Sequence, residues 1–244
     1  MELTRIHKQF QQYFRVVPAS TPELQAQAYR VRHQVYCREL GWEPLQENEQ
    51  ETDQFDKLAH HCLLQNVNND EFVGCIRMVM LDPEDPMAPM PFQLACKQLR
   101  EGEPDTEQQR RQVVAEVSRL AVIGKYRRRP HEQKQAVSIN DADFGTLKQP
   151  RFPYIPIGLY LGLLEMARIN GIETLYILTE PGLARHFCKL GGKLEQIGEP
   201  IEHRGTRAPY KMEVNKVIAD MSLMLRPLFK VICKEVHQGY SGKS

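Results

Sequence analysis

The sequence lacks the cysteine and histidine spacings of a metal site. It has six cysteines, but they are widely separated, form no CxxC pair and have no histidines at ligand spacing. We therefore expect reduced thiols and no bound metal. The cysteines are Cys37, Cys62, Cys75, Cys96, Cys188 and Cys233.

Long apolar runs are also absent. No apolar segment approaches the ~18 residues that a membrane span requires. The first residues, MELTRIHKQFQQYF, carry charges throughout, which is unlike a secretory signal. These features predict a cytoplasmic protein.

A large charge of one sign is missing as well. The chain has 32 Lys and Arg against 31 Asp and Glu, a formal net charge of +1, so no global field attracts nucleic acid. Any anionic partner must be bound by a local patch. With 244 residues, 41% of them hydrophobic, the chain is long enough to bury a sizeable core, and we expect a single domain over 1–244.

The segment VVAEVSRLAV, 113–122, is the most informative stretch that is present. It places Glu116, Ser118 and Arg119 inside an apolar run of strand length, where charge is unfavourable unless it is paired or used. Strict alternation puts Glu116 and Ser118 on one face. Arg119 joins them only if a bulge shifts the register, as often happens beside active sites. The alternative is an edge strand with one solvated face.

The first half of the chain predicts an early helix and a β-hairpin. Ser20 and Glu23 form a capping box for a helix from about 22 to 40, and strands are expected at 61–67 and 72–81. The hairpin strand carries Arg77, which we interpret as a partner for a carboxylate. One face of the expected helix carries Tyr29, Arg32 and Tyr36, whose side chains can then face a common space.

An acidic loop follows the single tryptophan, Trp42. From 43 to 56 it holds six acidic residues and no Lys or Arg. Such runs are usually solvated. This one ends in TDQFD and passes directly into a strand, so we expect Asp53 and Asp56 to be held near the protein surface.

The second half alternates between helices and strands. We expect the second-half strand at 174–179 to pair in parallel with the Glu116 strand, because a helix intervenes. A helical extension is predicted over about 214–238, with its helix interrupted at Pro227. The other expected elements are helices at 157–170 and 182–190 and a strand at 193–197.

A polar insertion lies at about 123–156 and opens with a basic cluster. Its length indicates either a functional segment or partial disorder. A solvated charge run and an anion site are equally good interpretations of the cluster. Its members are Lys125, Arg127, Arg128 and Arg129.

The order of these elements resembles the α/β GNAT (acyl-CoA N-acyltransferase) fold, with a mixed central sheet flanked by helices and an extra C-terminal helix. Four segments in order, RHQVYCRELGW, ETDQFD, FVGCIRM and EVSRLAV, resemble the signature of acyl-homoserine-lactone synthases, a branch of that fold. The resemblance implies a site built from Arg32, Tyr36, Trp42, Asp53, Asp56, Arg77, Glu116, Ser118 and Arg119. Tyr36 departs from the phenylalanine usual there.

The segment GEPIEHRGTRAPY and the C-terminal helix are similar to the acyltransferases associated with PEP-CTERM/exosortase systems. This group and the related N-acyl amino acid synthases join long acyl chains to amino acids. The resemblance then spans nearly the whole chain. It implies an N-acyltransferase that moves a fatty acyl group to an amino-acid-type acceptor.

No tightly bound cofactor is expected, and the donor would be an acyl-phosphopantetheine thioester. The chain lacks the glycine-rich turn that holds a pyrophosphate at a helix N-terminus, which disfavours coenzyme A. The basic cluster suits the acidic surface of an acyl carrier protein. We therefore favour acyl carrier protein as donor and partner over coenzyme A, and leave peripheral membrane contact and the oligomeric state open.

Within this hypothesis Glu116 is the first choice for the general base, since an apolar strand raises its pKa, and Asp53 is the second. Backbone N–H groups from Ser118 to Leu120 would stabilise the oxyanion. Two alternatives stay open. One is a lactone synthase that uses S-adenosylmethionine, and the other is a catalytically silent module that binds an acyl carrier or a lipid.

Overall fold

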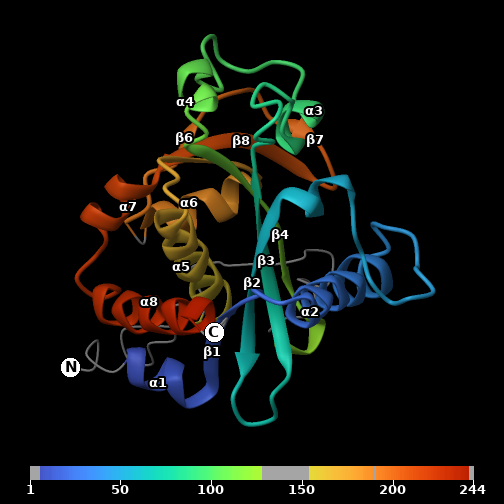
Figure 1. Ribbon diagram of the computed structural model, residues 1–244, viewed down its shortest axis with the longest axis vertical. Helices are drawn as coiled ribbons and strands as arrows, with labels where there is room; N and C mark the ends of the chain where they lie inside the picture. Colours follow the sequence, from blue (N-terminus) through green and yellow to red (C-terminus); the bar gives the residue numbers. More distant parts are fainter. Residues whose placement is uncertain (1–5, 128–153, 190, 242–244) are drawn as a thin grey trace.

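A mixed sheet of eight strands forms the centre of the described part of the chain (Figure 1). This computed structural model describes residues 6–127, 154–189 and 191–241. The strand order is β1-β2-β3-β4-β5-β8-β6, and β7 pairs with β8. The strands are β1 Phe14–Pro18, β2 Ala59–Asn66, β3 Phe72–Met80, β4 Val114–Val122, β5 Thr174–Thr179, β6 Glu195–Gln196, β7 Ile201–Glu202 and β8 Thr206–Glu213.

Helices cover both faces of this sheet. The helix α2 packs on β2, β3 and β4 from one side, and α5 packs on β1 to β4 from the other, with α8 against α5 and β1 (Figure 1). The helices are α1 Ile6–Tyr13, α2 Pro22–Arg32, α3 Pro91–Ala95, α4 Thr106–Arg110, α5 Tyr154–Ile169, α6 Pro181–Lys189, α7 Val214–Asp220 and α8 Arg226–Ser241. A π-helix, His33–Glu39, continues α2, and 3₁₀ turns occupy Gln54–Leu58 and Gly124–Tyr126.

The main core lies between the sheet and α5. This helix is apolar nearly all round and is almost entirely buried, which is typical of a helix enclosed by other elements. Gly162 permits its close approach to the sheet, because a Cβ there would lie 2.7 Å from Val16 Cγ1 and 2.8 Å from Cys62 Sγ. A smaller core, with Val35 and Leu63, lies under α2.

The predicted bulge in β4 is confirmed. Arg77 pairs with Ser118 and Cys75 with Ala121, so Arg119 and Leu120 together oppose one residue of β3. Arg119 has φ +53°, a left-handed conformation that is uncommon outside glycine. The bulge turns the Arg119 side chain toward the face that Ser118 occupies.

The parallel pairing of β4 with β5 is also confirmed. It runs from Val114 opposite Thr174 to Val117 opposite Ile177 and ends there. Beyond this point β5 continues to pair with β8 as far as Thr179, while β4 continues along β3. The two strands therefore separate directly after Glu116 and Val117.

Three local expectations are corrected. Thr21, not Ser20, caps α2, since its hydroxyl accepts from Leu24 N, whereas Ser20 Oγ donates to the Gly239 carbonyl. Pro227 does not interrupt a helix: it lies in the first turn of α8, where a missing N–H is tolerated, and the break falls between α7 and α8. The helix α5 begins at Tyr154, inside the segment expected as an insertion, of which 128–153 lie outside the described residues.

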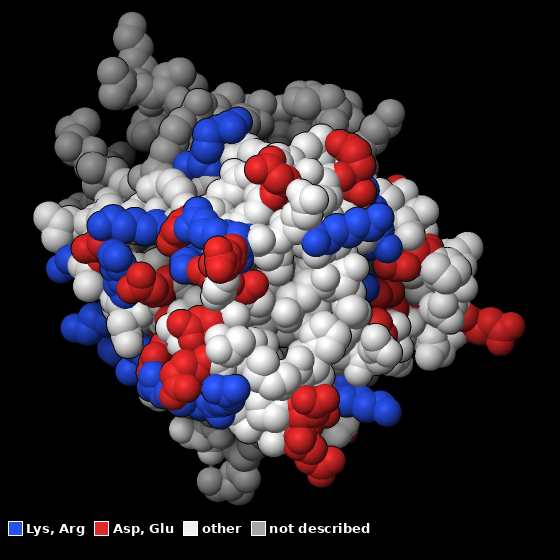
Figure 2. All heavy atoms as spheres, turned by 90° about the horizontal axis from the view of Figure 1, so that it is seen from above, with Lys and Arg blue, Asp and Glu red and all other residues white. Residues whose placement is uncertain are grey.

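None of the described helices has both the length and the apolar composition needed to span a bilayer. On the face seen from above, acidic and basic groups are interspersed with uncharged surface (Figure 2). That face offers no continuous basic surface for a phosphate backbone.

Candidate active site

The acidic loop folds into a compact turn that presents two carboxylates to the sheet. Asp53 Oδ1 accepts from Phe55 N at 2.9 Å, and Asp56 Oδ2 accepts from Asp53 N at 2.7 Å, so each carboxylate caps the short 3₁₀ turn. In the turn that TDQFD forms, each of these carboxylates keeps one oxygen that accepts no hydrogen bond from the turn itself. The expectation that Asp53 and Asp56 are held in place is confirmed.

Two arginines bind these carboxylates from α2 and β3. Arg32 donates to both oxygens of Asp56, at 2.6 and 3.0 Å. Arg77 Nη1 lies between the two acids, 2.7 Å from Asp53 Oδ1 and 2.9 Å from Asp56 Oδ1. Its Nε donates to Ser118 Oγ at 3.0 Å. Both arginine side chains are buried, so these pairs are protected from screening by solvent.

A third arginine and a third carboxylate close the network. Arg119 donates to Asp53 Oδ2 at 3.0 Å and to Glu51 Oε1 at 3.2 Å, and Glu51 in turn accepts from Arg32 Nε. Charges of opposite sign therefore alternate around a closed six-membered ion-pair ring with no net charge. Its members, in order, are Arg32, Asp56, Arg77, Asp53, Arg119 and Glu51.

The ring sets the protonation of its acids. Burial alone would raise the pKa of Asp53, but Arg77 and Arg119 lower it below its ordinary value. Burial would likewise raise the pKa values of Asp56 and Glu51. The hydrogen bonds and charge of Arg32 outweigh this effect, so both pKa values are lowered. The ring carboxylates are thus held ionised, and an acid held so firmly by two arginines is a poor proton acceptor.

This arrangement predicts resistance to acid. The three ring carboxylates have lower pKa values in the folded protein than in the unfolded chain. Their contribution to the free energy of unfolding is therefore complete above the ordinary carboxylate pKa of about 4 and is lost as the pH falls through the lowered values. We expect Glu51→Gln to unfold at a higher pH than the wild type in an acid titration followed by circular dichroism. Glu173→Gln, which breaks an exposed pair with Arg111, should leave the midpoint unchanged.

Glu116 lies apart from this ring, on β4. Its side chain is 3% exposed, and its Oε2 accepts one hydrogen bond, 2.8 Å long, from Phe92 N in α3. Burial raises the pKa of Glu116 to about 8, and the Phe92 N–H offsets only part of this effect. Of the two acids considered as base, Glu116 therefore has the pKa that suits proton transfer near neutral pH.

Tyr36 and Trp42 form an aromatic pair beside the bulge. Their rings stack with centroids 5.8 Å apart and planes at 20°. Tyr36 Oη donates to the Leu120 carbonyl at 3.0 Å, and burial raises the pKa of Tyr36 to about 12, so it stays protonated. The hydroxyl, which a phenylalanine would lack, holds the bulge in place. Arg119 lies over the Tyr36 ring, 5.7 Å from its centroid.

A cavity of about 280 Å³ opens where β4 and β5 separate. Its volume approaches that of small-molecule sites, roughly 300 Å³ and above. Glu116, Ser118 and Arg119 line it on β4, and the β5 residues 177–179 line it on the other strand. Apolar side chains form its walls: Phe92 and Leu94 of α3, Tyr160 of α5, Leu183 and Phe187 of α6, and Leu194.

The residues that the resemblance placed in the site divide into two groups. Trp42, Tyr36, Asp53, Arg77, Glu116, Ser118 and Arg119 all line this cavity. Arg32 and Asp56 do not line it and support it through the ring. Of the helix expected at 157–170, Tyr160 contributes to the wall, and its neighbours belong to the core.

The basic cluster differs from the exposed patch that we expected. Arg127 is buried and bound to Glu39, whose carboxylate also accepts from Gly124 N at 2.9 and 3.0 Å. Lys125 is exposed and pairs with Glu71 at 2.6 Å. Arg128 and Arg129 lie outside the described residues. Local acids therefore neutralise the two described members, and Arg127 is not available as a surface cation.

The sequence interpretation missed two features of the site. Glu51 was one of six acids in a loop, and nothing in its spacing separated it from its neighbours. The hairpin of β7 and β8 adds His203 and Arg204 from its turn and Arg207 from β8 to the cavity wall. The run HRGTR, with two arginines around a glycine turn, was the available signal for the latter.

Comparison with known proteins defines the class. Residues 31–134 match the family model described as an acetyltransferase (GNAT) domain. The mixed sheet, the helices on both its faces and the added C-terminal helix agree with that class, so the predicted GNAT-like fold is confirmed. The chain thus carries a domain of the enzyme class that transfers acyl groups.

Three solved structures illustrate the similarity of fold. The acyl-homoserine-lactone (AHL) synthase LasI has 18% identity and a TM-score of 0.53, with 88% of this chain and 94% of LasI covered. The CoA-dependent acyl-homoserine lactone synthase BjaI, with SAM and isopentyl-CoA, has 15% identity and a TM-score of 0.54, with 92% and 89% covered. FeeM, an N-acyl amino acid synthase from uncultured soil microbes, has 15% identity and a TM-score of 0.52, with 86% and 96% covered.

No curated protein sequence matches the chain. The structural similarities, all at low identity, establish the fold and leave the substrates to be argued from the site.

Proposed function

We propose that the protein is an N-acyltransferase that moves a fatty acyl group from a phosphopantetheine thioester to the amine of an amino acid. The observation that carries the proposal is the cavity between the separating strands β4 and β5. Glu116, whose pKa is raised, lines it together with an apolar wall suited to an acyl chain. A thioester arm lying between the strands would bring its carbonyl carbon next to the bulge.

In this mechanism the neutral amine nitrogen attacks the thioester carbonyl carbon. Glu116 accepts a proton from the amine, either directly or through water. Backbone N–H groups from Ser118 to Leu120 stabilise the oxyanion, at a position where the bulge breaks the regular pairing with β3. The C–S bond then breaks, and the thiolate leaves and takes up a proton.

The ion-pair ring would serve to position these groups. Arg77 holds Ser118 and Arg119 extends from the bulge, so the ring fixes the strand on which the chemistry takes place. In the proposal Asp53 positions the arginines instead of acting as a base.

For the donor we propose acyl carrier protein in preference to coenzyme A. The support is the sequence of 123–156, which lacks a glycine-rich turn and opens with four basic residues. Lys125 is the exposed member of this cluster among the described residues, and in the proposal it contacts the acidic carrier. The association with PEP-CTERM/exosortase systems stays a prediction from resemblance, and so does a cytoplasmic location.

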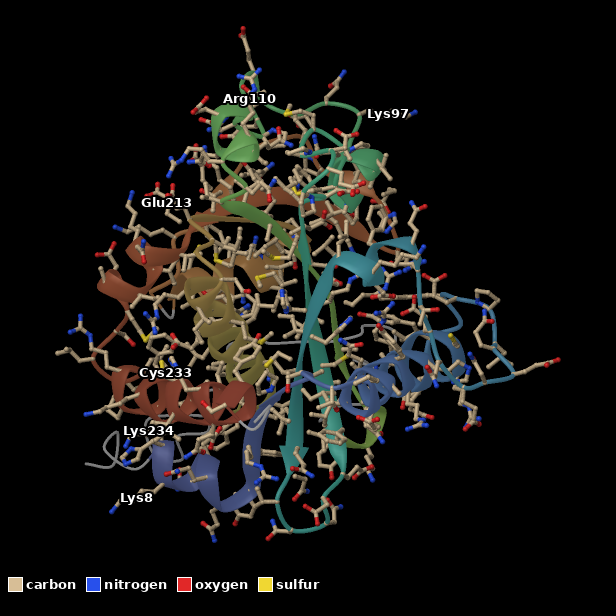
Figure 3. All side chains as sticks on the ribbon, viewed as in Figure 1. Lys8, Lys97, Arg110, Glu213, Cys233 and Lys234 are labelled. Carbon is tan, nitrogen blue, oxygen red and sulfur yellow. The ribbon has the colours of Figure 1, made fainter. Side chains whose placement is uncertain are left out.

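A charge reversal tests the proposed carrier contact. Lys125→Glu should reduce kcat/KM about three- to tenfold with dodecanoyl acyl carrier protein, because a peripheral charge mainly affects encounter. With dodecanoyl-CoA the value should not change. Lys234→Glu, on α8 (Figure 3), is the matched control and should have no effect with either donor. Equal effects of Lys125→Glu on both donors would exclude the contact.

The proposed reaction is tested with purified protein, dodecanoyl-thioester donors and each of the twenty amino acids, with thiol release and product mass as the readouts. S-adenosylmethionine is included as an acceptor, because the lactone synthases LasI and BjaI share the fold. An N-dodecanoyl amino acid supports the proposal. A lactone would assign the chain to signal synthesis, and an absence of transfer with every acceptor would contradict acyl transfer.

A further inference from the structure

The hairpin of β7 and β8 places two guanidinium groups over the single tryptophan. The Cζ of Arg204 lies 5.8 Å from the centroid of the Trp42 ring, and that of Arg207 lies 5.6 Å from it. All three residues line the cavity that Glu116 lines. The hairpin therefore places two cations beside the aromatic part of the cavity wall.

The two arginines differ in their partners. Arg204 is bound to the Glu43 carboxylate. Arg207 has no hydrogen bond or ion pair with any described residue, and its Nε is buried without a partner. Burial lowers the pKa of Arg207 below its ordinary value, although a guanidinium still stays charged at neutral pH. A desolvated donor group without an acceptor is unfavourable unless a ligand supplies the acceptor.

The other arginines of the cavity cannot provide such a site. Arg77 is bound to Ser118 and two aspartates, and Arg119 is bound to Glu51 and Asp53. Among the arginines in the described cavity wall, Arg207 is the one that has no carboxylate partner at ion-pair distance.

The polar neighbours of Arg207 leave these donors unoccupied. Glu180, on the wall beside it, makes no ion pair with Arg207 within the described chain, although the two groups interact at longer range. Burial lowers the pKa of His203, which leaves it neutral near pH 7. Arg204 and Arg119 add positive charge near Arg207, which suits an anion.

We propose that Arg207 binds the carboxylate of the acyl acceptor and so selects acceptors that carry a free carboxylate. The inference rests on the proposed function and specifies its acceptor. The guanidinium fork matches a carboxylate in two parallel hydrogen bonds, and the Trp42 ring beneath it orients the fork. A free amino acid and the amino-acid end of S-adenosylmethionine present the same carboxylate. Anchored there, the acceptor lies in the cavity that Glu116 lines.

A binding experiment tests this site without requiring turnover. The probe is N-decanoylglycine, which has the acyl amide and carboxylate of the simplest product, and its partner is N-ethyldecanamide, in which a methyl group replaces the carboxylate. Trp42 is the only tryptophan of the chain, so its fluorescence reports on binding beside Arg207. In the wild type we expect N-decanoylglycine to bind about 10- to 100-fold more tightly than the amide.

The variant Arg207→Gln should abolish this preference and leave the affinity for N-ethyldecanamide within about twofold. Arg204→Gln is the matched control: it also removes a guanidinium from the Trp42 ring, but we expect the preference for the carboxylate to remain. If Arg207→Gln keeps the preference, or if the wild type has none, the inference is overturned. Circular dichroism of each variant confirms that the fold is intact.

A kinetic comparison separates this inference from the proposed function. With an amino acid that the wild type acylates, Arg207→Gln should raise KM about 10- to 100-fold with little change in kcat. With the corresponding decarboxylated amine it should change neither constant. Unchanged kinetics with the amino acid would overturn the Arg207 site while acyl transfer stands. Failure of the wild type to acylate any acceptor would overturn the proposed function, and the binding experiment would still decide the site. The product mass then distinguishes a free amino acid from S-adenosylmethionine.

Discussion

Replacing Glu116 with glutamine is expected to lower kcat by about 100- to 1,000-fold, which is the usual contribution of a general base. Glutamine has the same shape, and its carbonyl oxygen can still accept from Phe92 N, but it cannot take a proton from the amine. The acylation assay measures the loss. The binding of N-decanoylglycine should be unchanged, because the carboxylate contact does not involve Glu116.

The pH dependence of the same variant provides a second measurement. Only the ionised form of Glu116 can act as the base, and its pKa is raised to about 8, so kcat/KM of the wild type should show an inflection near pH 8 in addition to the titration of the substrate amine. The variant should show only the titration of the substrate amine. An inflection near pH 8 that persists in Glu116→Gln would remove Glu116 from this role.

Stability supplies the control for folding. The folded protein keeps the Glu116 proton up to about pH 8, whereas the unfolded chain loses it near 4.5, so this group makes the wild type less stable as the pH rises between those values. Glu116→Gln removes that effect. We expect its melting temperature at pH 8.5 to equal or exceed that of the wild type, as measured by calorimetry.

The second large effect is expected from Arg77→Met. Removing this buried guanidinium leaves the partly buried Asp53 and Asp56 with one arginine fewer each, and breaking such a pair costs up to about 3–5 kcal/mol of unfolding free energy. For a chain of this length the melting temperature should fall by about 6–20 °C. Urea denaturation followed by circular dichroism measures the change.

An exposed arginine serves as the matched control for that variant. Arg111→Met breaks a pair with Glu173 in which both side chains are about half exposed, and we expect a loss of less than about 1 kcal/mol. If Arg77→Met folds too weakly to study, Arg77→Lys can replace it, because lysine keeps the charge but not the guanidinium fork. Its loss of unfolding free energy should lie between those expected for Arg77→Met and Arg111→Met. Equal small losses in Arg77→Met and Arg111→Met would show that the ring does not stabilise the fold.

The sequence allowed the central strand to be predicted because its chemistry is local. Charged residues inside an apolar run required a partner or a function, and the position of Arg119 required a bulge. Arg32 and Arg77 could be expected to pair with carboxylates for the same reason. Their closure into a ring through Glu51 could not, because it depends on how a loop of six acids folds over α2 and β4.

Long-range contacts also account for the other differences between the predictions from sequence and the structure. Glu39, distant in the sequence, buries Arg127, so the basic cluster could not be recognised as partly neutralised from its own residues. Arg207 reaches Trp42 across 165 positions through the sheet order that places β8 beside β5. His33–Glu39 continues α2 as a π-helix, a rare form that helical periodicity does not distinguish from an α-helix.

The central claim is that this site transfers an acyl group to an amine, and mass spectrometry of lipid extracts from bacteria expressing the protein tests it most directly. Extracts with the wild-type chain should contain new N-acyl amino acids, and extracts with Glu116→Gln at equal protein level should lack them. Lactones in place of these products would contradict the proposed acceptor. The absence of any new acylated product from cells containing folded wild-type protein would contradict the acyl transfer itself.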